Sequence, residues 1–306
     1  MRAIYWKELR DHFGRRRFNL MLGLVLVGIV WAAFIHKNVV ITQGTGAFYL
    51  DVFTTTSGVP LSLLTFISFF GPVIGITLGF DSINSERTQG TLSRILAQPV
   101  YRDAVYNGKF LAGLTTLAVV VFSLGIAAVG VSMFRFGLPP TGDQVLRLIG
   151  FGCVTVVYLA FWLALSMTAS IYLRNAVASA LVSIGIWIGI SFFVVFASSA
   201  IAERFVPEVQ TLADQSRRTS IELWVGRVSP ERLYSEATGT LLDPIRGRFL
   251  NPFAIAPERL QDVLLSPVSA GQSLQLVWPH IVVMVAMIAG LLVVSYVRFM
   301  REEIRS

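Results

Sequence analysis

Residues 148–171 read LIGFGCVTVVYLAFWLALSMTASI, a run of 24 residues without a charged side chain. An α-helix rises about 1.5 Å per residue, so about 20 residues cross a hydrocarbon core of about 30 Å. This run is therefore long enough to span a membrane as a helix. The composition agrees, because the 306 residues are 54% hydrophobic and only 14% charged, whereas soluble domains are about 25% charged.

Five further runs have a comparable length and apolar character. None of the runs contains Asp, Glu, Lys or Arg before Arg298, near the end of the last one. The first follows a basic stretch, but no small-residue cleavage site follows it, so we interpret it as a retained anchor and not as a signal peptide. The single cysteine, Cys153, excludes an intramolecular disulfide. We expect an all-α membrane protein with six transmembrane helices, at 18–36, 61–80, 110–134, 148–171, 176–202 and 279–299.

The distribution of basic residues predicts the orientation. Cationic flanks of membrane spans tend to remain in the cytoplasm. With six spans both termini share one side, and that side carries fourteen lysines and arginines, whereas the opposite short loops carry three. We therefore expect a multi-pass protein of the prokaryotic cytoplasmic membrane with both termini in the cytoplasm. The lysines and arginines that border the membrane also account for the formal charge of +7. Such residues attract anionic lipids, so we expect contact with the lipid bilayer and no nucleic-acid partner.

Four segments follow from this plan: 1–17, 18–202, 203–278 and 279–306. The first predicts an amphipathic interfacial helix, because Ile4, Tyr5, Leu9 and Phe13 can share one face; the alternative is a basic flank without defined structure. The second holds spans one to five and a cytoplasmic loop at 81–109, and the fourth holds span six and a cytoplasmic tail. The third predicts an extracytoplasmic helical segment, packed on the outer ends of the helices or on a second subunit. Its prolines suit first helical positions and indicate helices at 207–226, Pro230–Leu242 and 257–265.

The longest cytoplasmic loop is the most informative stretch. Ser82 or Asn84 can cap a helix there through a side-chain oxygen, Gly90 weakens that helix, and Pro99 ends it. The helix has an apolar edge beside charged residues, which suits docking into a groove on a cytoplasmic partner. The alternative is a helix that lies on the lipid surface, and the pattern does not decide between them. The edge and its charged neighbours are Ile83, Leu92, Ile95, Leu96, Glu86, Arg87 and Arg94.

This loop resembles the hallmark of the ABC type-2 permease family. The matching stretches are FDSINSERTQGTL at 80–92, QPVYR at 98–102 and GKF at 108–110. WKELR at 6–10 is similar to the interfacial elbow helix of that family. SPERLY at 229–234 and LLDP at 241–244 resemble the external segment of one branch, which includes permeases linked to sodium export, gliding motility and nitrous-oxide-reductase maturation. The length of segment 203–278 departs from shorter members of the family.

The resemblance implies a coupling helix between the second and third spans that meets a cytoplasmic ATPase subunit. It implies two such ATPases, which carry ATP and Mg, and a second permease copy or paralogue, with no cofactor in this chain. By position, the implied ATPase-coupling residues are Glu86, Arg87, Gly90, Thr91, Leu92, Ile95, Pro99 and Arg102. The implied elbow residues are Trp6, Lys7, Glu8 and Arg10.

The six apolar runs also bear on the source of energy for transport. Ion-coupled carriers keep ionisable groups within the membrane, and the six runs hold none at mid-depth. The chain also lacks the G-x-x-x-x-G-K-[ST] loop that binds nucleotide phosphates. We therefore expect a permease subunit and not an enzyme. This subunit would couple ATP hydrolysis by another chain to export of a substrate from the cytoplasm.

Three alternatives stand beside this interpretation. A mechanotransmitting ABC membrane subunit would act on an extracytoplasmic partner without moving a solute. An intramembrane enzyme would need a nucleophile with a base or metal ligands at membrane depth, and no such set is evident. His280, Met284 and Met287 share one helix face and are candidate ligands for a soft ion such as copper(I), although methionines in apolar helices commonly serve packing. The sequence leaves the substrate, and the choice between homodimer and heterodimer, open.

Overall fold

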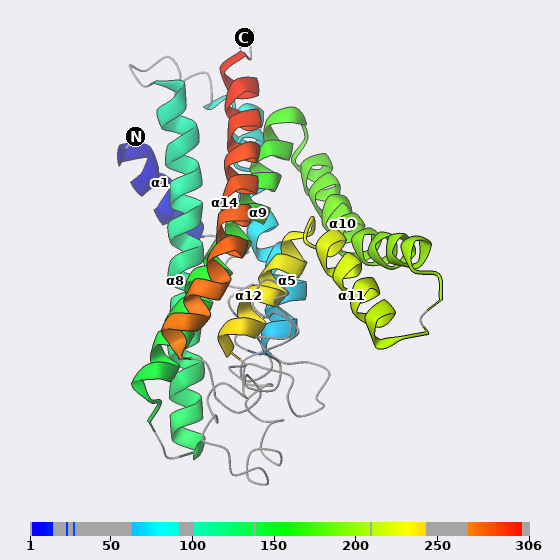
Figure 1. Ribbon diagram of the computed structural model, residues 1–306. Coiled ribbons are helices and arrows are strands. Elements are labelled where there is room, and N and C mark those ends of the chain that lie inside the picture. The colour runs from blue at the N-terminus through cyan, green and yellow to red at the C-terminus, as the bar shows by residue number, and fades with distance from the viewer. Residues whose placement is uncertain are drawn as a thin grey trace.

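The structure is a computed structural model that describes residues 2–14, 23, 27, 63–91, 101–136, 139–208, 210–242 and 269–301. All regular structure in these ranges is helical (Figure 1), which confirms the all-α class. Five of the helices are long and apolar enough to cross a membrane. The predicted span 18–36 and the predicted helix 257–265 lie outside the described residues, apart from Gly23 and Val27. The helices are α1 (Arg2–Gly14), α5 (Leu63–Gly79), α6 (Asn84–Thr88), α8 (Arg102–Phe136), α9 (Gly142–Tyr172), α10 (Ala176–Phe205), α11 (Leu212–Gly226), α12 (Pro230–Leu242) and α14 (Ala270–Arg301).

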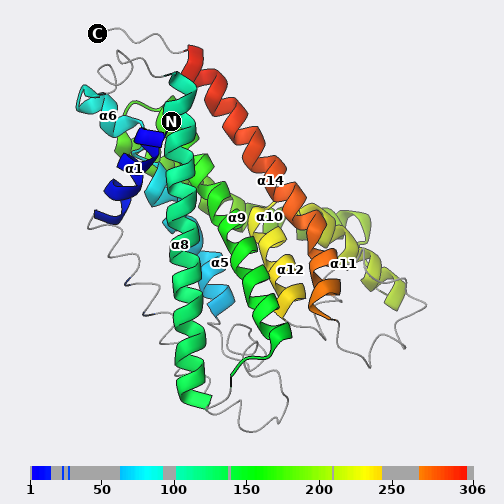
Figure 2. The same cartoon turned by 90° about the vertical axis from the view of Figure 1, so that its left-hand side faces the viewer.

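Helix α9 is the centre of the bundle. It packs against α5, α8, α10, α12 and α14, and 72% of its most apolar stretch is buried, against 11% in α10. Helix α10 slants away from the other long helices, with α11 beside it (Figure 1). Helix α1 lies beside α8, toward the end of the bundle where α6 and the C-terminal end of α14 also lie (Figure 2).

Three glycines on one face of α5 allow α9 to approach closely. Gly71, Gly75 and Gly79 are four residues apart and therefore lie above one another on the helix. A Cβ atom at Gly75 would lie 2.6 Å from the carbonyl oxygen of Leu159 and 2.9 Å from Cβ of Trp162. These contacts involve the α9 backbone, which cannot move aside as a flexible side chain can. The two helices are thus held at a distance that only glycine permits, as is common between helices in membranes.

Helix α12 lies beside the N-terminal half of α9. The ring of Tyr234 stacks on that of Tyr158, with centroids 4.3 Å apart, and its hydroxyl lies 3.0 Å from Oγ1 of Thr155. The chain runs along α10, returns along α11 and turns again into α12 (Figure 1). Helix α12 packs with one apolar face, in which Leu233, Tyr234, Ala237 and Leu241 are all buried. It contacts Arg147 and His280, which stand at the predicted outer ends of their spans, and reaches inward to Tyr158.

Helix α12 also brings charge beside the long apolar helices. Oε2 of Glu236 lies 2.9 Å from Nε of Arg227 and 3.2 Å from Nε2 of His280, and Oε1 lies 3.2 Å from Nε of Arg232. Glu236 and His280 are both buried, and a buried charge in such a setting requires partners of this kind. The six predicted spans hold no ionisable group at mid-depth, and Glu236 meets the last of them at His280, the second residue of 279–299.

Candidate functional site

The ammonium group of Lys109 joins three segments that are far apart in the sequence. Lys109 lies near the start of α8, and its Nζ is 2.7 Å from Oε1 of Glu8 in α1 and 2.9 Å from Oε1 of Glu86 in α6. The exposed fractions of Lys109, Glu8 and Glu86 are 4%, 6% and 6%. Hydrogen bonds between ionised groups are stronger than neutral ones, so this cluster fastens α1 and α6 to α8. We call it the Lys109 junction.

Lys7 completes the charge balance of the Lys109 junction. Its Nζ lies 3.3 Å from Oε1 of Glu86 and 3.6 Å from Oε1 of Glu8, with a side chain that is 53% exposed. Burial would raise the pKa of Glu8, but the ammonium groups of Lys109 and Lys7 outweigh it and hold that pKa below its ordinary value. Burial would likewise lower the pKa of Lys7, but the carboxylates of Glu8 and Glu86 outweigh it and raise that pKa. Two cations thus balance two anions.

Backbone N–H groups at the start of α6 donate hydrogen bonds to a side chain of α9. The hydroxyl oxygen of Ser170 accepts hydrogen bonds from the backbone N–H groups of Ile83 and Asn84, each at 3.2 Å. Such N–H groups have no partner within their own helix. The prediction that Ser82 or Asn84 caps this helix is wrong, because the N-cap residue is Ile83 and no side-chain cap is present. A serine of another helix takes that role.

Arg87 also bonds α6 to the C-terminal end of α9. Its guanidinium donates to the carbonyl oxygens of Ser170 at 3.3 Å and Ile171 at 3.2 Å. These carbonyls belong to the last turn of α9, where they lack intrahelical partners and where a positive charge is favoured. Helix α6 is therefore bonded to α9 through both Ser170 and Arg87.

The part of α6 that faces outward is its C-terminal end. Thr88, Gln89 and Gly90 are exposed, whereas Glu86 is buried. Gly90 has φ of +65°, a left-handed conformation that glycine adopts without steric cost. Thr91 folds back, and its hydroxyl donates to the carbonyl oxygen of Glu86 at 3.3 Å. We call Thr88, Gln89 and Gly90 the exposed tip.

The structure brings some of the predicted site residues together. Glu86, Arg87, Gly90 and Thr91 lie in or next to α6, whereas Leu92, Ile95 and Pro99 lie outside the described residues. Arg102 begins α8, and its side chain also lies outside the described part.

The face that α1 turns to α8 differs from the predicted apolar face. Glu8 and His12 are its buried residues, and the hydroxyl of Tyr5 donates to Oγ1 of Thr115 at 3.0 Å. Trp6 and Arg10 are exposed, and so is Phe13. Lys109 was not among the predicted site residues, although it lies in GKF at 108–110, one of the stretches that resemble the family.

The candidate metal ligands have other neighbours. His280 lies beside Glu236, Met284 is fully buried, and Met287 is partly buried. Within the described ranges there is no group of three or more His, Cys, Asp or Glu residues that could hold a metal ion. A copper site at this helix face remains a prediction without structural support.

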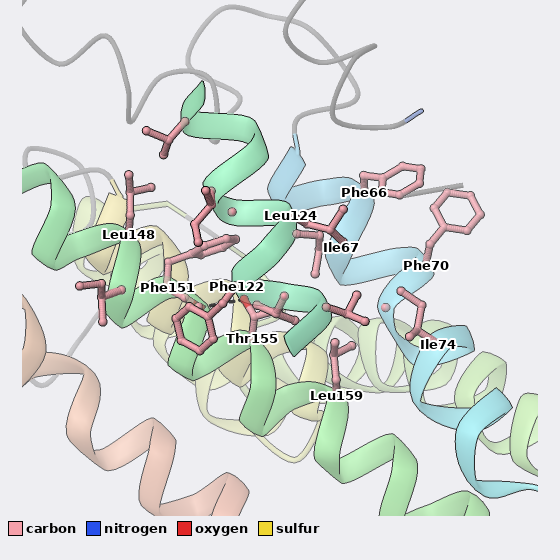
Figure 3. Close-up of a pocket in the computed structure, with 18 of the residues that line it drawn as sticks. Phe66, Ile67, Phe70, Ile74, Phe122, Leu124, Leu148, Phe151, Thr155 and Leu159 are labelled. Carbon is pink, nitrogen blue, oxygen red and sulfur yellow. Dashed lines mark hydrogen bonds between the residues drawn. The ribbon is translucent and has the colours of Figure 1, made fainter. Parts of the chain in front are cut away.

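An apolar cavity of about 270 Å³ lies between α5, α8 and α9 (Figure 3). Phe66 and Phe70 of α5, Phe122 of α8 and Phe151 of α9 line it. The hydroxyl of Thr155 also faces this region, but it is already bonded to the carbonyl oxygen of Phe151 at 2.8 Å. The described lining thus suits an apolar group and carries no charge to hold a polar solute.

The sequence matches a known family along nearly its whole length. A family model described as an ABC-2 family transporter protein matches residues 2–304. The chain therefore belongs to the ABC-2 transporter family and is a multi-pass membrane subunit of the ABC transporter permease class.

Two curated relatives carry a more particular name. The chain is similar to the Probable ABC transporter permease protein NosY of Pseudomonas aeruginosa, with 30% identity over 175 residues that cover 54% of this chain and 58% of that protein. It is also similar to the protein of the same name from Stutzerimonas stutzeri, with 29% identity over 136 residues, or 43% of this chain and 45% of that protein. The chain thus spans about half the length of the curated relatives that it matches.

Proposed function

We propose that this chain is the membrane-spanning permease subunit of an ATP-driven exporter in a prokaryotic cytoplasmic membrane, with both termini in the cytoplasm. ATP and Mg would be held by two separate ABC ATPase subunits, and a second copy or a paralogue would complete the membrane part. The observation that carries the proposal is the setting of α6. At the position of the family's coupling helix, α6 offers an exposed tip and is bonded to α1, α8 and α9.

The bonds of α6 suggest how a push by the ATPase would reach the membrane. Displacement of the exposed tip acts on α8 and α1 through the Lys109 junction, and on α9 through Arg87 and Ser170. Separating Lys109 from Glu86 would leave buried charge without a partner, and loss of one partner of a buried ion pair costs about 3–5 kcal/mol. Helix α9 in turn contacts α5, α12 and α14. The push would thereby re-orient the bundle and open a path for the substrate to the outside.

This arrangement divides the predicted coupling residues into two kinds. Glu86 and Arg87 would act by positioning the tip, because their described contacts are with this chain. Thr88, Gln89, Gly90 and Thr91 would meet the ATPase directly. Leu92 and Ile95 would supply the apolar part of that contact.

Co-expression with an ABC ATPase subunit from the same organism tests the proposal. We expect the ATPase to co-purify with the wild-type chain in detergent, and its ATP hydrolysis to rise when the two are reconstituted in liposomes. The double variant Glu86→Arg with Arg87→Ala should lose both, whereas Glu203→Arg, at an exposed position near the end of α10, should retain both. Unchanged assembly and hydrolysis in the double variant would show that the site assignment is wrong.

Solute flux separates export from mechanotransmission. An exporter in liposomes moves a solute across the bilayer in an ATP-dependent way. A mechanotransmitting subunit hydrolyses ATP with its partner but moves none of the solutes offered, and its output appears only with an extracytoplasmic partner present.

A further inference from the structure

A polar hollow of about 250 Å³ lies beside the Lys109 junction. It is lined from α1, from the segment that links α5 to residue 91, and from α8 and α9. Its charged lining consists of four carboxyl groups and two ammonium groups, a formal charge of −2 with His12 neutral. The chain as a whole carries +7, so this described lining has the opposite sign. These charged residues are Glu8, Asp11, Asp81, Glu86, Lys7 and Lys109.

One carboxylate oxygen in this hollow lacks a partner. Glu86 is 6% exposed, and its Oε1 receives both Lys7 and Lys109. Its Oε2 is buried and has no hydrogen-bond partner within the described part of the chain, and the same holds for Oγ of Ser82, which also lines the hollow. A buried acceptor without a donor costs about 1–3 kcal/mol, and more for a charged group. The hollow therefore presents two acceptors to an incoming donor.

The charge and the acceptors of the lining indicate which kind of donor the hollow suits. No group of three His, Cys, Asp or Glu residues that could hold a metal ion is found among the described residues. A guanidinium or ammonium group meets both requirements, because it carries positive charge and donates several hydrogen bonds. The hollow is also much larger than the share of about 30 Å³ that one water molecule takes in the liquid.

The position of the hollow indicates where the cation comes from. Gln89 lines the hollow and also belongs to the exposed tip, and Thr91 lies at the same edge. A protein that covers the tip is therefore placed to insert a side chain. We propose that the hollow receives an arginine or lysine side chain of the docked ATPase subunit, which donates to Oε2 of Glu86 and Oγ of Ser82. This inference rests on the proposed function and adds the chemistry of the contact.

Substitution of Asp11 tests the inference without breaking the Lys109 junction. Asp11 lines the hollow and is only partly buried. With the purified chain in nanodiscs, Asp11→Asn should weaken ATPase binding on the order of threefold to tenfold, and Asp11→Arg should weaken it further, because like charges across an interface repel. Asp103→Asn is the matched control, since Asp103 is an acidic, partly buried residue in the first turn of α8 that is outside the hollow. It should bind as the wild type does.

Charge reversal on the partner identifies the source of the cation. One arginine or lysine of the ATPase, changed to glutamate, should restore binding to the Asp11→Arg chain. The rival source is a small free cation, for which spermidine is the probe. If spermidine binds the wild-type chain without ATPase, is lost in Asp11→Arg, and no partner reversal restores binding, the side-chain proposal is overturned.

The outcomes also separate this inference from the proposed function. If the ATPase binds wild type and Asp11→Arg equally well, the inference fails and the proposed function stands. If the ATPase does not bind the wild-type chain at all, the proposed function itself fails. Equal thermal unfolding of wild type and both Asp11 variants confirms that the comparison is between folded chains.

Discussion

Nζ of Lys109 lies 2.9 Å from Oε1 of Glu86, and the same ammonium lies 2.7 Å from Oε1 of Glu8. One buried charge thus holds the segment after α5 and the N-terminal helix against α8. Because α6 is also bonded to the end of α9, movement of its exposed tip would be transmitted to α1, α8 and α9.

Lys109→Met should destabilise the chain strongly. It keeps the side-chain length but leaves Glu8 and Glu86 buried with only Lys7, and removal of one partner from a buried ion pair costs about 3–5 kcal/mol. Lys7→Met is the control: because its side chain is 53% exposed, its loss should cost less than about 1 kcal/mol. Thermal unfolding in detergent measures both. Equal losses in the two variants would contradict the central role of Lys109.

Stability should fall in acid and not near neutrality. The folded pKa of Glu8 is lowered from 4.5, so its ionised form contributes stability above about pH 4.5 that is lost as the pH falls through the lowered value. We expect an unfolding temperature that this group leaves unchanged between about pH 8 and pH 5.5 and reduces below about pH 4. Glu8→Gln should remove this acid step. A step near neutral pH that disappears in Glu8→Gln would contradict the assignment.

Gly75→Leu should separate α5 from α9. A side chain there meets the Leu159 carbonyl oxygen and the Trp162 Cβ atom, which are 2.6 and 2.9 Å from the position of a Cβ atom. Overpacking costs about 1–3 kcal/mol even where side chains can adjust, and here backbone must move. Gly130→Leu in α8 is the matched control, because nothing lies within 4 Å of a Cβ atom there. Thermal unfolding should distinguish them clearly.

Gly90→Val should impair coupling without unfolding the chain. Space is open around Gly90, but its φ of +65° costs about 1–2 kcal/mol for most residues. Gly90→Asn is the informative control, because asparagine tolerates this conformation better. We expect stimulated ATP hydrolysis to fall several-fold in Gly90→Val and much less in Gly90→Asn. The same loss in both variants would mean that backbone conformation is not the cause.

Local signals in the sequence predicted single elements well. Pro230 placed α12 at Pro230–Leu242, as observed. The prediction of a helix start at 207 was wrong, because α11 begins at Leu212, where the side chain of Thr211 caps it. Asn175 caps α10 by accepting a hydrogen bond from the N–H of Val177 at 2.8 Å, in the short gap between the predicted spans 148–171 and 176–202. These features depend on neighbours in the chain, which the sequence displays directly.

Contacts between distant segments were not predictable from the sequence. The partner of Lys109 in α1 is 101 positions away, so nothing in the local pattern marks the pair. Arg147 is one of the three basic residues in the short loops predicted opposite the termini, but it is 1% exposed and donates to the Leu241 carbonyl oxygen at 2.8 Å. The position of α12 against α9 and α14 likewise depends on Tyr158 and His280, which lie in those helices.

Site-specific photo-crosslinking from the exposed tip tests the central claim most directly. A benzoylphenylalanine residue at Gln89, in membranes that contain the co-expressed ATPase subunit, should yield one adduct with that subunit. The same probe at Val228, which is 68% exposed in the turn between α11 and α12, should yield none. No ATPase adduct from Gln89, or an equal adduct from Val228, would contradict the claim that α6 is where energy enters this chain.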